Sequence, residues 1–176
     1  FADVQLADLK TWGGTPAEAW TSRGVLEKNP ALVGILTNYA HKIDDWNPEK
    51  AKATFKLQQA RWSNEVAKAK AAGKPPPGPP RLAVDPKTDP HRPTCLYNAM
   101  IAPLVPYAIR GATWYQGESN AGRAREYESL LPAMIGNWRR DFGVGDFPFL
   151  LVQISAYNGQ PPTIREAQLH IAQRTK

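Results

Sequence analysis

The spacing of apolar side chains predicts two helices in the first half of the chain. Apolar residues recur at a helical period over residues 30–46, and again along one side of residues 48–73, where lysine and glutamine occupy most other positions. An Asn-Pro pair opens each segment, supplying an N-cap and a proline for the first turn, and a glycine closes the second. Each segment is therefore predicted to be one amphipathic helix.

The segment that follows, residues 74–80, reads Lys-Pro-Pro-Pro-Gly-Pro-Pro and cannot be helix or strand. This composition is typical of a stiff, extended connector, although a motif for a proline-binding partner has the same letters. We expect residues 29–80 to form an inserted antiparallel helical hairpin followed by this Pro-rich connector.

In the second half the pattern changes from strand to helix and back. An apolar run over 108–114 leads to a polar corner, and an apolar stripe at helical spacing follows over 124–142, where Pro132 should kink the helix or begin a second one. Residues 147–154 are the best buried strand of the chain, and 164–174 form a last amphipathic helix. Strand, helix and strand in this order predict a βαβ unit and an α/β fold with a parallel sheet.

Two segments give no single prediction. Residues 94–107 are apolar and interrupted by prolines, which fits a buried helix or a loop. Residues 1–10 mix apolar and charged positions, so an edge strand, a short helix or sequence foreign to the rest of the domain all stay open.

The polar corner at residues 114–120, Trp-Tyr-Gln-Gly-Glu-Ser-Asn, is the main candidate for chemistry. Ligands of open α/β sheets bind at the carboxyl ends of strands, and this corner offers an amide, a carboxylate and a hydroxyl there. The alternative is a helix N-terminus capped by Ser119 or Asn120. The second candidate is a glycine-rich turn at Gly13 and Gly14. Such a turn can aim backbone N–H groups at a ligand oxygen, or it can be an ordinary tight turn.

Composition narrows the class of protein. The chain has 176 residues, enough for a single domain over 1–176, and its hydrophobic share of 42% and charged share of 22% are those of a globular protein. The net charge of +6 comes mainly from a lysine-rich helical face, without the interleaved aromatics of a nucleic-acid site. We therefore expect no nucleic acid and no membrane as partners.

The single cysteine, Cys95, excludes an internal disulfide and says little about the compartment. Its apolar neighbours favour a small buried side chain over a nucleophile, although His91 is near in sequence.

Four stretches of the chain, in order, resemble the sialate O-acetylesterase family, a branch of the SGNH hydrolases related to bacterial acetylxylan esterases. They are Trp12-Gly13-Gly14-Thr15-Pro16-Ala17-Glu18-Ala19-Trp20, Arg92-Pro93-Thr94-Cys95-Leu96-Tyr97-Asn98-Ala99-Met100-Ile101-Ala102-Pro103-Leu104, Trp114-Tyr115-Gln116-Gly117-Glu118-Ser119-Asn120 and Arg165-Glu166-Ala167-Gln168.

The resemblance implies a three-layer α/β/α fold of SGNH type, similar to flavodoxin, and hydrolysis of acetyl esters on sugars by a serine-esterase mechanism. An acetylated carbohydrate would be the substrate, no metal or organic cofactor would be needed, and the compartment would be secreted or periplasmic. It also implies residue roles. Gln116 and Gly13 or Gly14 would be oxyanion donors, and the carboxylate of Glu118 would support the histidine or order the site. Substrate-binding wall residues would be Trp114, Asn120 and Arg165.

Two blocks of the family pattern are absent. In the family the nucleophile lies in a Gly-Gln-Ser-Asn block, and these four letters do not occur in the chain. The base lies in an Asp-x-x-His block, which is also absent, because none of the three histidines has Asp three residues before it. The chain does not begin with Met and carries no recognisable signal peptide, so we expect a processed or excised piece. We predict it to be inactive or very weak unless the missing flanking segments are supplied.

Two alternatives use the same residues differently. Gly-Glu-Ser-Asn-Ala at 117–121 imitates a nucleophile elbow, which would make Ser119 the nucleophile with His91 or His170 as base. The other is a non-catalytic domain that binds a carbohydrate or a partner in the esterase cleft.

Overall fold

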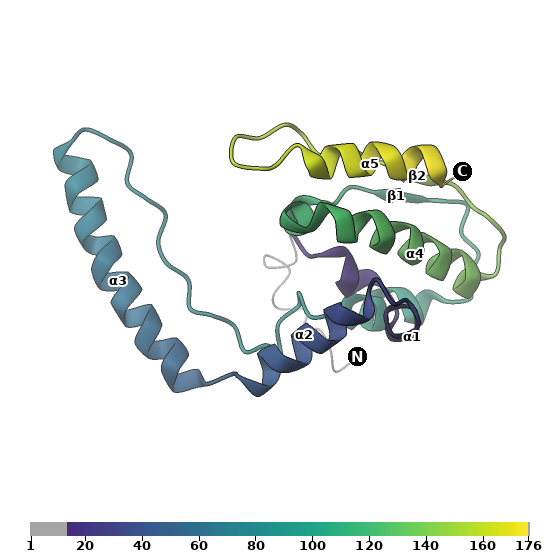
Figure 1. Cartoon of the computed structure of the whole chain (residues 1–176), viewed down its shortest axis with the longest axis horizontal. Helices are drawn as coiled ribbons and strands as arrows, with labels where there is room; N and C mark the ends of the chain where they lie inside the picture. Colours follow the sequence, from purple (N-terminus) through teal and green to yellow (C-terminus); the bar gives the residue numbers. More distant parts are fainter. Residues whose placement is uncertain (1–13, 176) are drawn as a thin grey trace. The chain divides into compact units, whose positions relative to one another are not determined.

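The computed structural model describes residues 14–175. It divides into two compact units, one made of Phe1–His41 with Pro90–Lys176 and the other of Lys42–Asp89 (Figure 1). Residues 1–10, Gly13 and the other positions before Gly14 lie outside the described part.

The helices and strands follow a simple order. They are α1 (Arg23–Lys28), α2 (Val33–Asp44), α3 (Pro48–Ala71), β1 (Ala112–Trp114), α4 (Ala124–Phe142), β2 (Phe149–Leu151) and α5 (Thr163–Arg174), with short helical turns at Ala17–Trp20, Tyr97–Ile101, Ala102–Leu104 and Glu118–Arg123.

The first unit contains the predicted βαβ arrangement. Strands β1 and β2 pair in parallel, with Ala112 opposite Phe149 and Trp114 opposite Leu151, and α4 lies between them in sequence. The α/β class predicted from the sequence is therefore confirmed. The three-layer arrangement requires more than this two-stranded sheet and stays a prediction.

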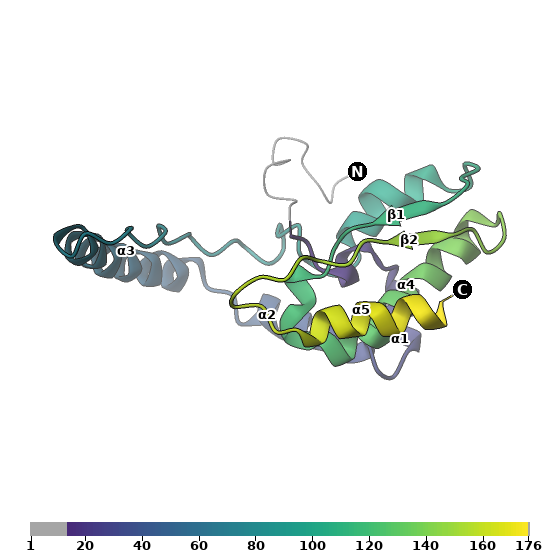
Figure 2. The ribbon, with the colours of Figure 1, turned by 90° about the horizontal axis from the view of Figure 1, so that it is seen from above.

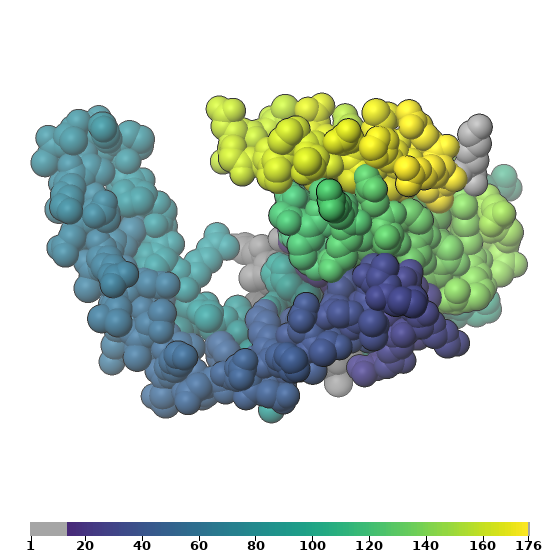
Figure 3. All heavy atoms as spheres, in the orientation of Figure 1, coloured from purple at the N-terminus to yellow at the C-terminus, as the bar shows by residue number. Residues whose placement is uncertain are grey.

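Helix α4 is the centre of the core in this unit. Its apolar stripe is buried, with Leu130, Met134 and Ile135 at 0% exposure. Helix α5 lies along one side of α4 and α1 along the other (Figures 1 and 3), and the views from two directions agree that α4 and α5 are neighbours (Figure 2). Burial of this stripe against two helices and the sheet stabilises the unit by the hydrophobic effect.

Proline and asparagine account for the differences at helix ends. Helix α4 runs through Pro132 as one element, so of the two expected outcomes, a kink or a second helix, the second does not occur. Asn29 does not begin the long helix: its side chain accepts from the Ala31 amide at 3.0 Å in a short turn, and α2 starts at Val33. Both strands span three residues, shorter than their apolar runs.

The second unit consists largely of α3 and the chain that returns after it. Asn47 caps α3 by accepting from the Lys50 amide at 2.9 Å, with Pro48 in the first turn, and Gly73 is left-handed just after the helix, as predicted. The Trp62 indole donates to the Pro77 carbonyl oxygen at 2.8 Å, which ties the Pro-rich connector to the helix. The antiparallel hairpin expected over 29–80 stays a prediction. Within residues 14–175, no helix is both long and apolar enough for a membrane span.

A buried asparagine joins α4 to α1. Asn137 is fully buried, its Oδ1 accepts from the Ser22 amide at 2.7 Å, and its Nδ2 donates to Asp141. Ser22 is the N-cap residue of α1, so a side chain of α4 satisfies a backbone donor at the start of another helix. Asp141 also accepts from Tyr97, and burial together with this bond raises the pKa of Tyr97 to about 12.

Replacing this side chain should therefore destabilise the fold measurably. We expect Asn137→Ala to lower the free energy of unfolding by about 1–3 kcal/mol, because the Ser22 amide loses its acceptor in a half-buried place. Urea unfolding of the chain measures this. The matched control is Asn38→Ala on the exposed face of α2, expected to change stability by less than about 0.5 kcal/mol. Equal effects of the two substitutions would contradict the role of Asn137.

Candidate functional site

The polar corner lies where the sequence predicted it, at the carboxyl end of a parallel strand. Strand β1 ends at Trp114, and the turn Glu118–Arg123 begins four residues later. Between them Gln116 is 8% exposed, whereas Tyr115 is 63% exposed. The chain thus directs the Gln116 side chain into the protein and leaves the preceding side chain, Tyr115, at the surface.

The buried amide of Gln116 meets the loop that starts at Gly14. Its Nε2 donates to the Thr15 carbonyl oxygen at 3.0 Å and to Asn120 Oδ1 at 2.7 Å. A carbonyl oxygen only accepts, so the nitrogen of the Gln116 amide must face Thr15, which fixes the orientation of the side chain.

Asn120 makes the second connection between the same two segments. It is fully buried, its Oδ1 also accepts from the Ala17 amide at 2.9 Å, and its Nδ2 donates to Glu18 Oε2 at 2.9 Å. One side chain therefore bonds to the corner and to two residues of the loop. Its role here is to hold the loops together from inside, while substrate-wall function for Asn120 stays a proposal.

A charged network continues from Glu18 to the surface. Glu18 is 5% exposed and pairs with Arg123, which also pairs with Glu126. Burial alone would lower the pKa of Arg123, but the charges of Glu18 and Glu126 outweigh it and raise that pKa above its usual value. Burial, assisted by the charge of Glu18, also raises the pKa of Glu126 despite Arg123. The buried Glu18 carboxylate therefore has a cationic partner that stays charged.

The backbone of the corner is fixed from the opposite side. The Gln116 carbonyl oxygen accepts from Gln168 Nε2 at 2.9 Å and from the Tyr127 hydroxyl at 3.3 Å. Gln168 Oε1 accepts in turn from the Ile154 amide at 3.1 Å. Burial raises the pKa of Tyr127 to about 12, so this hydroxyl stays protonated and able to donate. Residues of α4 and α5 thus support the corner where the sheet ends.

A pocket of about 220 Å³ opens where the two loops meet. Its lining residues are Gly14, Thr15, Trp20, Trp114, Tyr115, Gln116 and Glu118. The rings of Trp20 and Trp114 meet edge to face with centroids 6.0 Å apart, and the Trp20 indole donates to Thr15 Oγ1 at 2.9 Å. The pocket therefore combines aromatic walls, an exposed carboxylate and a backbone with a left-handed glycine, since Gly14 has φ +76°.

One polar atom of the pocket has no partner. Gln116 Oε1 is buried and accepts no hydrogen bond within the described residues, although both hydrogens of the same amide are used. An unsatisfied buried acceptor costs about 1–3 kcal/mol, so it favours any added group that donates a hydrogen bond there.

Most of the residues singled out in the sequence come together. Gly14, Trp114, Gln116 and Glu118 line one pocket. A Cβ added at Gly14 would lie 3.5 Å from Ser119 Oγ, which places Ser119 beside them.

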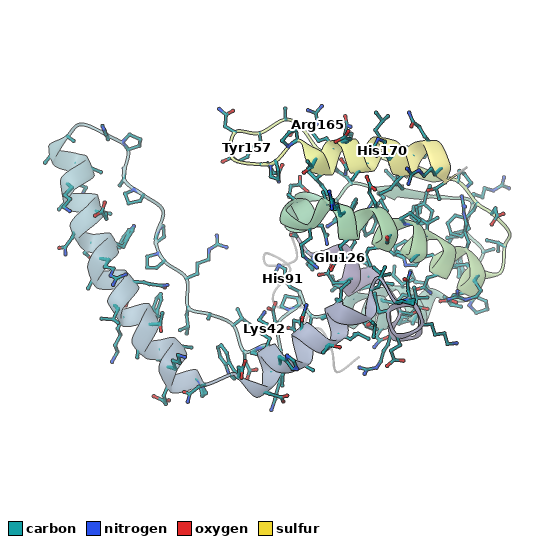
Figure 4. The ribbon with its side chains drawn as sticks, in the orientation of Figure 1. Lys42, His91, Glu126, Tyr157, Arg165 and His170 are labelled. Atoms are coloured by element: carbon teal, nitrogen blue, oxygen red, sulfur yellow. The ribbon has the colours of Figure 1, made fainter. Side chains whose placement is uncertain are left out.

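Ser119 and Asn120 do not line this pocket, although they lie next to residues that do. Arg165 does not line it either. It lies on α5 (Figure 4), where its guanidinium contacts Gln153 Oε1 at 3.4 Å and its carbonyl oxygen accepts from Gln153 Nε2 at 2.9 Å. Gly13 falls outside the described residues.

The structure shows no hydrogen bond between Ser119 and a histidine among the described residues, and the role of Ser119 as nucleophile stays a prediction. His170, on α5 (Figure 4), contacts Glu128 Oε1 through Nδ1 at 3.0 Å. His41 lies on α2, and His91 in the segment between Pro90 and the turn at Tyr97. No group of three or more His, Cys, Asp or Glu that could hold a metal occurs in the described part of the chain.

Sequence reasoning missed the residues that support the site from inside. They are Thr15, Glu18, Arg123, Tyr127 and Gln168. A signal was present for two of them: Glu18 is the one charge in the apolar stretch Pro16–Trp20, and Gln168 interrupts the buried stripe of Ile164 and Ile171. A polar residue in an otherwise buried stripe indicates a bonded partner.

The close packing at Gly117 yields a test of this support. A Cβ at this position would lie 2.9 Å from Gln168 Nε2 and 3.3 Å from Ile154 Cγ2. We expect Gly117→Ala to lower the free energy of unfolding by about 1–3 kcal/mol, because Gln168 must give up its bond to the Gln116 carbonyl oxygen. The control is Gly122→Ala in the following turn, where an added Cβ meets nothing within 4 Å. Thermal or urea unfolding that does not separate the two variants would show that Gln168 is not held in place.

Comparisons with known proteins agree with the motifs. A family model described as "Carbohydrate esterase, sialic acid-specific acetylesterase" matches residues 88–176. The chain is 32% identical over 155 residues to the sialate O-acetylesterase of Rattus norvegicus, covering 84% of this chain and 25% of that protein. The Mus musculus protein of the same name is 30% identical over 164 residues, covering 84% and 25%. The Homo sapiens protein is 31% identical over 154 residues, covering 83% and 21%.

No solved structure matches the chain. The chain spans about a quarter of the length of the curated relatives it matches. The matched region of the family model begins at residue 88 and includes the whole polar corner, helix α4 and helix α5. On this evidence the chain belongs to the sialic acid-specific acetylesterase family of carbohydrate esterases.

Proposed function

We propose that this chain supplies the oxyanion-binding half of a sugar O-acetylesterase active site. The observation that carries the proposal is the meeting of two loops, at Gly14–Thr15 and at Trp114–Glu118, around one pocket of about 220 Å³. The nucleophilic serine and the histidine base belong to flanking segments of the same enzyme, in keeping with the quarter of the relatives' length that the chain spans. The finer fold is the three-layer α/β/α sandwich of SGNH enzymes.

Gln116 and the glycine turn are the proposed oxyanion donors. In acyl transfer, negative charge develops on the carbonyl oxygen of the ester, and N–H groups fixed in advance around that position stabilise it. Gln116 is held at the pocket by Thr15 and Asn120, and Gly14, which lines the same pocket, is a candidate for the backbone donor. Gly13, outside the described residues, is the other candidate. Gln116 keeps its position and shares one Nε2 hydrogen, bonded in this structure to Thr15 or Asn120, with the oxyanion in a three-centre hydrogen bond. A neutral amide does this without acting as a base.

Glu118 is the proposed partner of the histidine. Its side chain lines the pocket and is exposed, so a histidine carried by a neighbouring segment can reach it. A carboxylate beside an imidazole fixes its tautomer and stabilises the imidazolium that forms when the serine loses its proton.

The walls of the pocket suit a sugar ring. Trp20 and Trp114 present aromatic edges and faces, and we assign Trp114 to substrate contact. Asn120 contributes by holding the loops, and Arg165 contacts the substrate only if the sugar reaches beyond the pocket toward α5. The relatives carry the name sialate O-acetylesterase, which makes an acetylated sialic acid the first substrate to test, in a secreted or periplasmic enzyme.

Substituting Glu118 tests the proposal most cleanly, because the side chain is exposed and the amide is isosteric. In the protein that carries this chain with its flanking segments, we expect Glu118→Gln to lower kcat on p-nitrophenyl acetate by about 10²–10⁴-fold, since the histidine loses its orienting charge. The 176-residue chain alone should show no turnover above background. Steady-state kinetics with the acetyl ester measures both.

Ser119→Ala is the matched control at the next exposed position. It should change kcat by less than about threefold, because the proposal gives Ser119 no chemical step. Turnover by the chain alone that disappears in Ser119→Ala would replace the proposal by the elbow mechanism. Tight binding of an acetylated sugar without hydrolysis in the longer protein would favour the non-catalytic binding domain.

A further inference from the structure

The unit Lys42–Asp89 contains a pocket of its own, of about 310 Å³. All of its lining residues belong to this unit: Asp45, Trp46, Asn47, Lys50, Ala51, Thr54, Phe55, Gln58, Arg81 and Ala83. They come from the turn before α3, the first turns of α3 and the chain returning after the Pro-rich connector. A volume near 300 Å³ is at the small end for ligand sites and matches one ring with its substituents.

Two hydrogen bonds hold the walls of this pocket in position. The Asn47 side chain caps α3 through the Lys50 amide, which fixes the turn that carries Trp46. The bond from the Trp62 indole to the Pro77 carbonyl oxygen holds the returning chain against α3 four residues before Arg81. The pocket is therefore a preformed feature of the unit, and a preformed site binds with less loss of conformational entropy.

The side chains in the pocket combine aromatic surface with two cations and one carboxylate, that of Asp45. Trp46 and Phe55 are half-buried, so part of each ring faces the pocket. Lys50 and Arg81 are exposed, and neither forms an ion pair within residues 14–175. An aromatic ring packs against the C–H face of a sugar, and a guanidinium fork matches a carboxylate in a bidentate manner.

The charge of the whole unit points to an anionic ligand. Residues 42–89 carry ten Lys or Arg and six Asp or Glu, so they hold four of the six net positive charges of the chain. Such a field concentrates anions near the surface. A nucleic acid would need a track of phosphate-binding cations along several nucleotides, whereas the charged residues that line this pocket are two cations and the Asp45 carboxylate.

We propose that this pocket binds a carboxylated sugar ring, the acidic unit of a glycan. Arg81 and Lys50 pair with the carboxylate, Trp46 and Phe55 pack on the ring, and Thr54 and Gln58 bond to its hydroxyls. Binding here involves no acetyl group and none of the residues around Gln116, so it is independent of the proposed esterase reaction. The unit thereby anchors an acidic glycan on the enzyme.

Calorimetric titration of the 176-residue chain tests this with sugars that carry no O-acetyl group. We expect saturable binding of 3′-sialyllactose or a glucuronate oligosaccharide, weakened by added salt, and no binding of lactose. Arg81→Ala should weaken binding about tenfold by removing a charge-assisted pair, and Trp46→Ala should weaken it to a similar degree, with Trp46→Phe restoring most of it.

The matched control is Arg61→Ala, which removes the same charge from α3 outside the pocket and should leave the affinity within about twofold. Glu118→Gln should also leave it unchanged, which separates this site from the esterase proposal. Circular dichroism checks that each variant keeps its helix, and Arg81→Ala carries the test if Trp46→Ala unfolds. The proposal is overturned if lactose binds as well as the acidic sugars, if Arg61→Ala weakens binding as much as Arg81→Ala, or if no acidic sugar binds.

Discussion

The candidate site depends on one buried amide, the side chain of Asn120. Its oxygen accepts from the Ala17 amide and from Gln116 Nε2, and its nitrogen donates to Glu18. The two segments that it joins are about 100 residues apart in sequence, with separations of 103 to Ala17 and 102 to Glu18. If the Asn120 side chain is removed, one of the described direct hydrogen bonds between the glycine-rich loop and the corner remains. It is the bond from Gln116 Nε2 to the Thr15 carbonyl oxygen. The pocket exists because the two loops are held edge to edge.

Helices α4 and α5 fix the backbone of the corner on the side away from the glycine-rich loop. Helix α4 supplies Tyr127 and α5 supplies Gln168, and both donate to the Gln116 carbonyl oxygen. Trp114 contributes an edge-to-face chain of rings, with Trp20 at 6.0 Å and Trp138 at 5.8 Å between centroids. Sites carried by rigid elements and fixed by such bonds hold their geometry without a bound ligand. The proposed esterase function uses this rigidity, because an oxyanion site stabilises charge only when its donors are fixed beforehand.

The sequence predicted the parts of the site that depend on local patterns. The strand, the polar corner and the helix after it follow from an apolar run, a cluster of polar letters and a 3.6-residue period, so the place of Gln116 and Glu118 at a strand end was predictable. The bonds from Asn120 to Ala17 and Glu18 were not, because no local rule states which distant loop a buried amide will meet. The motif at Trp12–Trp20 indicated a turn near the site through resemblance, but it did not predict that Glu18 would lie buried against Arg123.

The helix boundaries also show that local sequence patterns do not predict what tertiary packing decides. Asn29 and Pro30 have the composition of a helix start, yet Asn29 caps a tight turn and α2 begins later, because Leu32 is buried in the core and fixes the chain there. Pro132 was expected to interrupt α4, but the flanking Leu130, Leu131 and Met134 are buried on one continuous stripe, and that burial outweighs one lost backbone bond. Tertiary packing decides such points, and it is not visible in a short window of sequence.

Amide hydrogen exchange at Ala17 tests the central claim most directly. The Ala17 N–H bonds to the Asn120 side chain at 2.9 Å, so its protection reports whether the two loops are joined. In Asn120→Ala we expect the Ala17 amide to exchange at least about tenfold faster, while the amides in the middle of α4 keep their protection. Unchanged protection of Ala17 in this variant would contradict the account, because the loops would then be held together by something other than Asn120.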